Sequence, residues 1–285
     1  MAENGSMLNK DFYNLSLIWL LVLFSSQALA TSEEIASIAN SANHYPDVNL
    51  HEQTPLPAHE DSLWMKAVDL CARDRHWEPG LIRSFTRYVD KTEYPKSFES
   101  FWRRHSPGEN GEVKKEIIKA LKNGKDITEK KQKKYSKPAK PTDGISETAL
   151  GLDGTLPFDT EIQAQISYRR IDLENSPRCE NAVAFSFTRQ MEHTAHLSGI
   201  VWLDANTGRP LKLLYAPDPL PGRIKKMTIE MLFDSTPEGA WKPSEVNITA
   251  MGKFLFFTKR LRNTTSITDY WNRKNPAEQK SLTCR

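Results

Sequence analysis

The chain has 285 residues with a formal net charge of +3 and an isoelectric point near 8.6. This mild positive charge does not indicate a nucleic-acid partner. The length is sufficient to bury a real core, as one large domain or two small ones.

Residues 1–30 predict a secretory signal peptide. Lys10 precedes the short apolar run 15–24, and a small-x-small cleavage site ends at Ala30. The apolar run is shorter than the about 20 residues of a membrane span, although an uncleaved N-terminal anchor remains the alternative. Thr31 follows the site in place of a cysteine, so we expect a periplasmic or secreted protein without a lipid anchor.

Export favours disulfides, and the chain carries Cys71, Cys179 and Cys284. Three cysteines allow three pairings with one thiol left over. We expect Cys71 to pair with Cys284, which would tie the first helix to the C-terminus. The alternative is that all three thiols are free.

The polar, proline-containing segment 31–60 predicts a flexible lead-in. A helix is expected over 61–75, capped by Asp61 or Ser62. Its apolar residues at helical spacing are Leu63, Trp64, Ala67, Leu70 and Cys71. This face packs on a sheet or covers the mouth of a cavity, and Trp64 and Leu70 are the candidate cover residues.

Strands are expected over 82–90, 98–105 and 112–121. A Lys-rich helix and loop insertion follows at 129–143, with Thr128 as the cap of a helix that begins at Glu129. Its aromatic content offers no stacking platform for nucleic acid. We expect either a solvated segment or a peripheral contact with an anionic membrane through 130–140.

The C-terminal half predicts a run of antiparallel strands. The expected strands are 162–173, 182–189, 195–204, 209–216, 225–234, 242–252 and 254–269. Within 225–234 the apolar residues Met227, Ile229, Met231 and Phe233 recur at every second position, which predicts one buried face. The turn residues of 204–208 predict a hairpin. We expect a single domain over 61–272 and a polar tail at 273–285.

No pattern of catalytic or metal-binding chemistry is present in the sequence. It lacks HExxH, paired CxxC, G-x-S-x-G and phosphate-binding glycine loops. His193 and His196 would lie on opposite faces of a strand, which is unsuitable for one metal ion. We therefore expect no catalytic residue, no metal and no cofactor.

Apolar side chains on neighbouring strands are the candidate ligand site. In the ordinary case they form a core, and in the functional case a curved sheet leaves part of them lining a cavity. The candidate lining residues are Trp202, Leu213, Met227, Met231, Leu255 and Phe257.

Four short segments then occur in a familiar order along the chain. They are Gly199-Ile-Val-Trp-Leu-Asp204, Thr207-Gly-Arg-Pro-Leu211, Gly239-Ala-Trp-Lys-Pro243 and Asp269-Tyr-Trp271. This series resembles periplasmic proteins related to outer-membrane lipoprotein-sorting carriers, the LolA-like superfamily. The segment 122–129 is similar to a motif of one bacterial branch, and the resemblance covers roughly 62–271.

The resemblance implies an α+β fold: an unclosed, curved antiparallel half-barrel of about 9–11 strands with helices over its concave face. Members carry acyl chains or lipoproteins across the periplasm, or sense them. For the arginine that holds the carrier's lid shut, Arg83, Arg87 and Arg103 are candidates by location only.

The expected function is therefore non-covalent binding of an apolar or lipidated ligand, an acyl chain or a lipoprotein, in the concavity. One alternative is a protein-interaction or sensor module of the same fold, with a filled core and an envelope protein as partner. A second is an envelope hydrolase, whose paired carboxylates one sequence cannot locate.

Overall fold

The computed structural model describes residues 61–89, 94–108, 112–135, 156–171, 181–191, 195–220, 224–254 and 257–275, with the backbone alone at 253, 254 and 257. The expected signal peptide and lead-in, the second half of the Lys-rich insertion and most of the polar tail lie outside these ranges.

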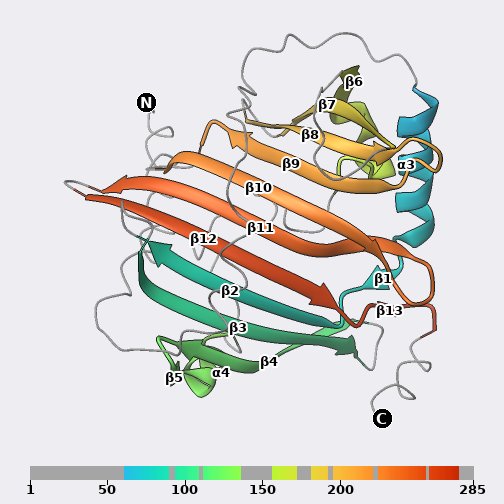
Figure 1. The fold of residues 1–285 in the computed structure, drawn as a ribbon. Coiled ribbons are helices and arrows are strands. Elements are labelled where there is room, and N and C mark those ends of the chain that lie inside the picture. The colour runs from blue at the N-terminus through green and yellow to red at the C-terminus, as the bar shows by residue number, and fades with distance from the viewer. Residues whose placement is uncertain are drawn as a thin grey trace, which may run out of the picture.

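One antiparallel sheet of 11 strands forms the body of the protein, in the order β5-β4-β3-β2-β12-β11-β10-β9-β8-β7-β6 (Figure 1). Its strands are β2 (Leu81–Val89), β3 (Pro95–Pro107), β4 (Val113–Lys122), β5 (Lys125–Asp126), β6 (Ile166–Ile171), β7 (Ala182–Gln190), β8 (His196–Asp204), β9 (Pro210–Asp218), β10 (Ile224–Ser235), β11 (Trp241–Phe254) and β12 (Phe257–Thr268). The edge strands β5 and β6 do not pair with each other, so the sheet is not closed. The predicted unclosed, curved antiparallel sheet is confirmed.

Smaller elements complete the described fold. They are the helices α3 (Ser62–Asp74) and α4 (Thr128–Tyr135), the 3-10 helix η2 (Thr160–Gln165), and the strands β1 (Trp77–Glu78) and β13 (Trp271–Asn272). β1 and β13 pair with each other in a separate two-stranded sheet, which brings the start of the described chain next to its end.

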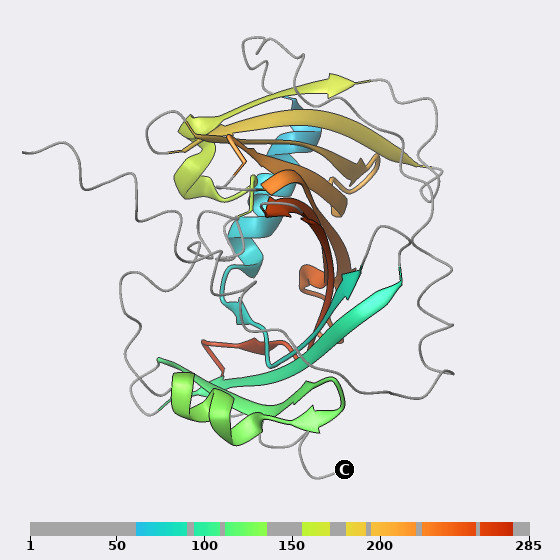
Figure 2. The same cartoon turned by 90° about the vertical axis from the view of Figure 1, so that its left-hand side faces the viewer.

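Helix α3 lies inside the curve of the sheet (Figure 2). Asp61 caps it as expected, because its carboxylate accepts a hydrogen bond from the Leu63 N–H at 2.8 Å. The buried residues of the helix are Leu63, Trp64, Ala67, Val68 and Asp74. Its apolar stripe shares one core cluster with side chains from β6 to β11, so the helix fills part of the concavity.

The period-two pattern of strand β10 is confirmed. Met227, Ile229, Met231 and Phe233 all belong to the core cluster that contains the α3 stripe. Strand β8 differs because nearly every residue from Leu197 to Leu203 is buried, on both faces of the sheet. Alternation in β8 therefore cannot show which of its residues face the concavity.

The expected strand 162–173 begins later than predicted. Asp159 starts the helical turn η2 by accepting a hydrogen bond from Glu161 N–H at 3.1 Å, and the strand β6 begins only at Ile166. Aspartate at this position favours a helix start, which outweighs the apolar alternation after it.

The expected cap of α4 is displaced by two residues. Asp126 accepts from Thr128 N–H at 2.8 Å, so the helix begins at Thr128. The Thr128 hydroxyl instead accepts from Ala120 N–H at 2.9 Å and holds the helix against β4.

The C-terminal end of α3 is anchored to the sheet by a buried carboxylate. Asp74 accepts two hydrogen bonds from Arg73, at 2.7 and 2.8 Å, and one from Trp241 N–H at 2.8 Å. Burial acts to raise the pKa of Asp74, but these hydrogen bonds outweigh it and lower the pKa below its ordinary value. At the other end, Arg170 of β6 pairs with Asp61 at 3.2 Å.

Gly208 closes the β8–β9 hairpin directly against α3. Its φ of +72° favours glycine, and an added Cβ would lie 2.6 Å from the Cβ of Lys66 and 3.0 Å from the Leu63 carbonyl oxygen. The hairpin therefore requires glycine for two separate reasons, its backbone angle and its contact with the helix.

We predict that Gly208→Ala lowers the free energy of unfolding by about 2–4 kcal/mol, because it adds a clash with α3 to the backbone strain. Gly124→Ala is the matched control: its φ of +78° is similar, and nothing lies within 4 Å of its added Cβ. The control should lose only about 1 kcal/mol in urea-induced unfolding. Equal losses would contradict the described contact.

Candidate functional site

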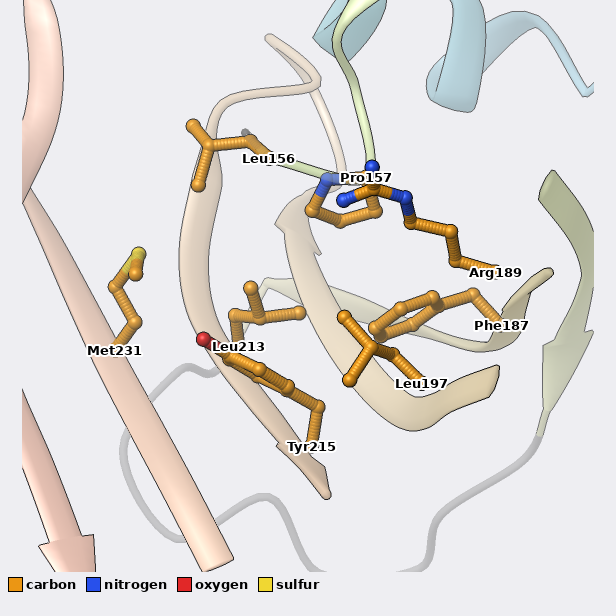
Figure 3. A pocket seen from close by; sticks show the side chains of 8 residues that line it. All are labelled: Leu156, Pro157, Phe187, Arg189, Leu197, Leu213, Tyr215 and Met231. Atoms are coloured by element: carbon orange, nitrogen blue, oxygen red, sulfur yellow. The ribbon is translucent and has the colours of Figure 1, made fainter. Parts of the chain in front are cut away.

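A pocket opens on the concave face of the sheet between β7, β8, β9 and β10 (Figure 3). Its lining residues are Leu156, Pro157, Phe187, Arg189, Leu197, Leu213, Tyr215 and Met231. The cavity between these side chains is about 10 Å³, roughly the room that one water molecule needs, and the wider empty space of about 290 Å³ around it includes open solvent. The pocket is therefore far smaller than a typical ligand site, and a ligand could enter it only if the side chains around it moved apart.

The walls of the pocket are formed by side chains that the neighbouring strands direct to the same face of the sheet. The wall residues Phe187, Leu197, Leu213, Tyr215 and Met231 are each at most 5 % exposed. Side chains at every second position point to one face, so these strands deliver their apolar residues to the same side.

Gly199 allows the two aromatic rings of the wall to approach the backbone. An added Cβ there would lie 2.6 Å from the Cβ of Tyr215 and 2.7 Å from Cε1 of Phe187. Any larger residue at this position would displace the rings that shape the pocket.

Leu156 and Pro157 form the cover of the pocket (Figure 3). Gln163 fixes this segment, since its Nε2 donates to the carbonyl oxygens of Pro157 and Asp159, both at 2.8 Å. The Oε1 of Gln163 accepts from Nε1 of Trp64 at 3.1 Å. The pocket cover and helix α3 are thus joined through one amide side chain.

Trp64 is the centre of an aromatic group on the same face. Its ring stacks on Tyr168 at 4.1 Å between centroids with 6° between the planes, and it lies 4.9 Å from Phe158 and 5.8 Å from Phe185. The residue is fully buried, whereas Leu70 is half-buried. Trp64 thus covers the concave face as a packed core residue.

The sequence-predicted lining residues separate into three groups. Leu213 and Met231 line the pocket, and Met227 belongs to the same core cluster. Trp202 lies in a second cluster with Ala184, Ile200 and Leu214, on the opposite face of the sheet. Leu255 and the side chain of Phe257 lie outside the described part of the chain.

Arg189 is the lining residue that the sequence analysis missed. The Nε and Nη1 atoms of its guanidinium are buried and have no hydrogen-bond partner within the described residues. A signal was present, because Arg189 occupies the position after Val183, Phe185 and Phe187 in an every-second-residue apolar series. Among the lid-arginine candidates, Arg83 lies over the Trp102 ring at 5.2 Å.

Cys71 is half-buried on α3 and has no disulfide partner among the described residues. Burial raises its pKa to about 11, so the thiol stays protonated and unreactive at neutral pH. Cys179 and Cys284 lie outside the described residues, and the Cys71–Cys284 disulfide stays a prediction.

Among the residues that the structure describes, no group of three His, Cys, Asp or Glu side chains is placed to hold a metal ion. No helix in that part of the chain combines the length and apolar character that a membrane crossing requires.

His105 in β3 is a second buried polar group, 5 % exposed. Neither of its ring nitrogens has a hydrogen-bond partner within the described ranges. Burial, with Arg103 and Lys115 nearby, lowers its pKa from 6.5 to about 4. The imidazole is therefore neutral in the folded protein at neutral pH.

Comparison with known proteins finds similarity only among solved structures. No protein-family model matches the chain, and no curated protein matches it. A structure described as an outer membrane lipoprotein-sorting protein domain from Vibrio parahaemolyticus is similar at 12 % identity and a TM-score of 0.37, over 78 % of this chain and 98 % of that one.

Two complexes of MucB are also similar over 72 % of this chain and 93 % of theirs. MucB bound to periplasmic MucA has 9 % identity and a TM-score of 0.21. The MucA/MucB complex of Pseudomonas aeruginosa has 10 % identity and a TM-score of 0.18. The first of these three structures is described as a lipoprotein-sorting domain, the kind of protein that the sequence resembles.

The neutral, buried His105 predicts a specific pH dependence of stability. Its pKa is about 4 in the folded protein and about 6.5 when unfolded, so the unfolded chain takes up the proton first as the pH falls. Stability is complete above pH 6.5 and is lost progressively down to pH 4, by about 1–3 kcal/mol. We expect His105→Phe to remove this part of the difference between urea midpoints at pH 7.5 and 4.5. An unchanged difference would contradict the neutral state of His105.

Proposed function

We propose that this chain is an exported periplasmic protein that binds an acyl chain, free or on a lipoprotein, non-covalently on the concave face of its sheet. The observation that supports this most directly is the apolar pocket under Leu156 and Pro157. Its wall is apolar apart from the Tyr215 hydroxyl and Arg189.

The energetics of such a site require no catalytic group. Burial of one methylene contributes about 0.8 kcal/mol, so about five buried methylenes contribute about 4 kcal/mol before the costs of association. Met231 suits this role, because its unbranched thioether adapts to a flexible chain. A short segment of an acyl chain would enter here by displacing Leu156 and Pro157 from the wall, and the remainder would extend through the open side.

A protein-interaction module is the second candidate, and one observation favours it. Trp64 and the rest of the α3 stripe fill much of the concavity, as in a folded core. In that case the pocket would be a packing defect, and the partner would be an envelope protein that contacts the outside of the domain.

Contact with an anionic membrane stays a prediction. Within the described part of the insertion, Lys131 pairs with Glu99, and Lys133 pairs with Glu129 at 2.6 Å. These pairs reduce the positive charge that α4 presents to a lipid surface, although Lys130 and Lys134 of the same helix are exposed.

Native mass spectrometry of the protein purified from the cell envelope tests the proposal directly. We expect a bound amphiphile whose mass is lost on denaturation, identified by lipid extraction. Uniformly ligand-free protein that also fails to take up added fatty acid would support the interaction module instead.

Filling the pocket should block binding without a change of fold. We predict that Leu213→Phe raises the dissociation constant of a fluorescent fatty-acid probe by about tenfold, because the larger ring occupies the pocket. Leu214→Phe is the matched control, one residue away and buried at 9 % exposure on the opposite face.

Both substitutions overpack a buried site and should cost about 1–3 kcal/mol of folding stability. The two variants should therefore differ in their affinity for the probe, measured at a temperature well below the unfolding midpoint of either variant. Equal affinity in the two variants would place the acyl chain somewhere other than this pocket.

A further inference from the structure

The charge in the pocket comes from a strand that is otherwise apolar on this face. Phe185 and Phe187 of β7 are 0 % and 5 % exposed, and Arg189 is the next residue on their side. In the sheet register Arg189 lies between Leu197 of β8 and Ile166 of β6, which are both buried apolar residues. Arg189 therefore occupies a position where the every-second-residue pattern of β7 predicts an apolar side chain.

The guanidinium extends toward Pro157 at the cover of the pocket (Figure 3). Nε and Nη1 are buried without a hydrogen-bond partner in the described residues, and together they carry three of the five N–H donors of arginine. None of the eight lining residues is acidic. Arg189 as a whole is half-buried, and Nη2 is not one of these two atoms. Burial of Nε and Nη1 is costly, because it removes their water and no described residue replaces it.

An anion of the right shape would remove this cost. A guanidinium matches a carboxylate or a phosphate with two parallel, charge-assisted hydrogen bonds. The apolar wall beside it, formed by Phe187, Leu197 and Leu213, matches an alkyl chain attached to that anion. Both halves of a single-chain anionic amphiphile therefore have a complementary surface within one pocket.

We propose that Arg189 binds the anionic headgroup of a single-chain amphiphile whose alkyl chain lies against Phe187, Leu197 and Leu213. This inference rests on the proposed function and specifies its ligand. The shared chemistry of the headgroup is a carboxylate or a phosphate monoester, as in a fatty acid or a singly acylated phospholipid. Arg189 would fix the orientation of the ligand, with its charged end at the Leu156–Pro157 cover.

Three probes with the same twelve-carbon chain separate the contribution of the headgroup charge to affinity from that of the alkyl chain. Dodecanoate and dodecyl phosphate, below their critical micelle concentrations, and dodecanol, below its solubility limit, are titrated into the delipidated full-length mature protein. We expect both anions to bind at least about tenfold more tightly than dodecanol. The ratio between the two anions shows whether the site is shaped for a carboxylate or for a phosphate.

Arg189→Met should reduce the affinity for both anions to that for dodecanol, while dodecanol itself binds as before. Arg189→Lys should keep part of the preference, because it retains the charge and loses the planar fork. Arg104→Met is the control for net charge: Arg104 is exposed on β3, and its loss should leave all three affinities unchanged.

Stability of the ligand-free protein gives an independent measurement. If the guanidinium has no structural partner, Arg189→Met leaves the urea midpoint unchanged or raises it. A large fall in the midpoint would show that Arg189 serves the fold, and would overturn the proposal.

The binding outcomes also distinguish this inference from its premise. Anion preference that persists in Arg189→Met, or dodecanol binding as tight as the anions in the unmodified protein, overturns the role of Arg189 and leaves acyl binding intact. Failure of all three probes to bind overturns the proposed function together with it.

Discussion

The packing of α3 into the curve of the sheet is the constraint on which the rest of the structure depends. An 11-stranded unclosed sheet exposes a wide apolar face, and this face must be covered for the protein to remain folded in water. Trp64 provides the centre of that cover through its stack on Tyr168 and its bond to Gln163. The anchors at Asp61 and Asp74 fix both ends of the helix on the sheet.

The same constraint explains why the pocket lies where it does. Helix α3 covers only part of the concave face, and the segment before β6 covers more of it through Leu156 and Pro157. Between this segment and the strands remains a space that side chains do not fill. Gln163 joins this segment to Trp64, so the pocket cover and helix α3 are held to each other by hydrogen bonds.

Much of this fold could be predicted from the sequence, because the strands of the C-terminal half alternate clearly and end at glycine, proline and aspartate turns. The strand 225–234 was predicted nearly as observed, and Asp61 was one of the two candidate helix caps. The start of the strand near Ile166 was predicted less well. Asp159 caps the 3-10 helix η2, so the residues before Ile166 are helical where a strand was expected.

The candidate site was only partly predictable. Leu213 and Met231 were found by their apolar character, but apolar character alone does not assign a face in a strand buried on both sides, as Trp202 in β8 illustrates. Arg189 was passed over because a charged residue at a strand end normally points to solvent. Only the three-dimensional arrangement shows that its Nε and Nη1 are buried beside the apolar lining of the pocket.

Photo-crosslinking with a diazirine-bearing fatty acid identifies the residues that an acyl chain touches, and so decides whether it binds on the concave face. We expect crosslinks in the peptides that carry Phe187, Leu213 and Met231, on the concave face of the sheet. Crosslinks confined to the opposite face around Ile200 and Trp202, or none above the level of denatured protein, would contradict this expectation.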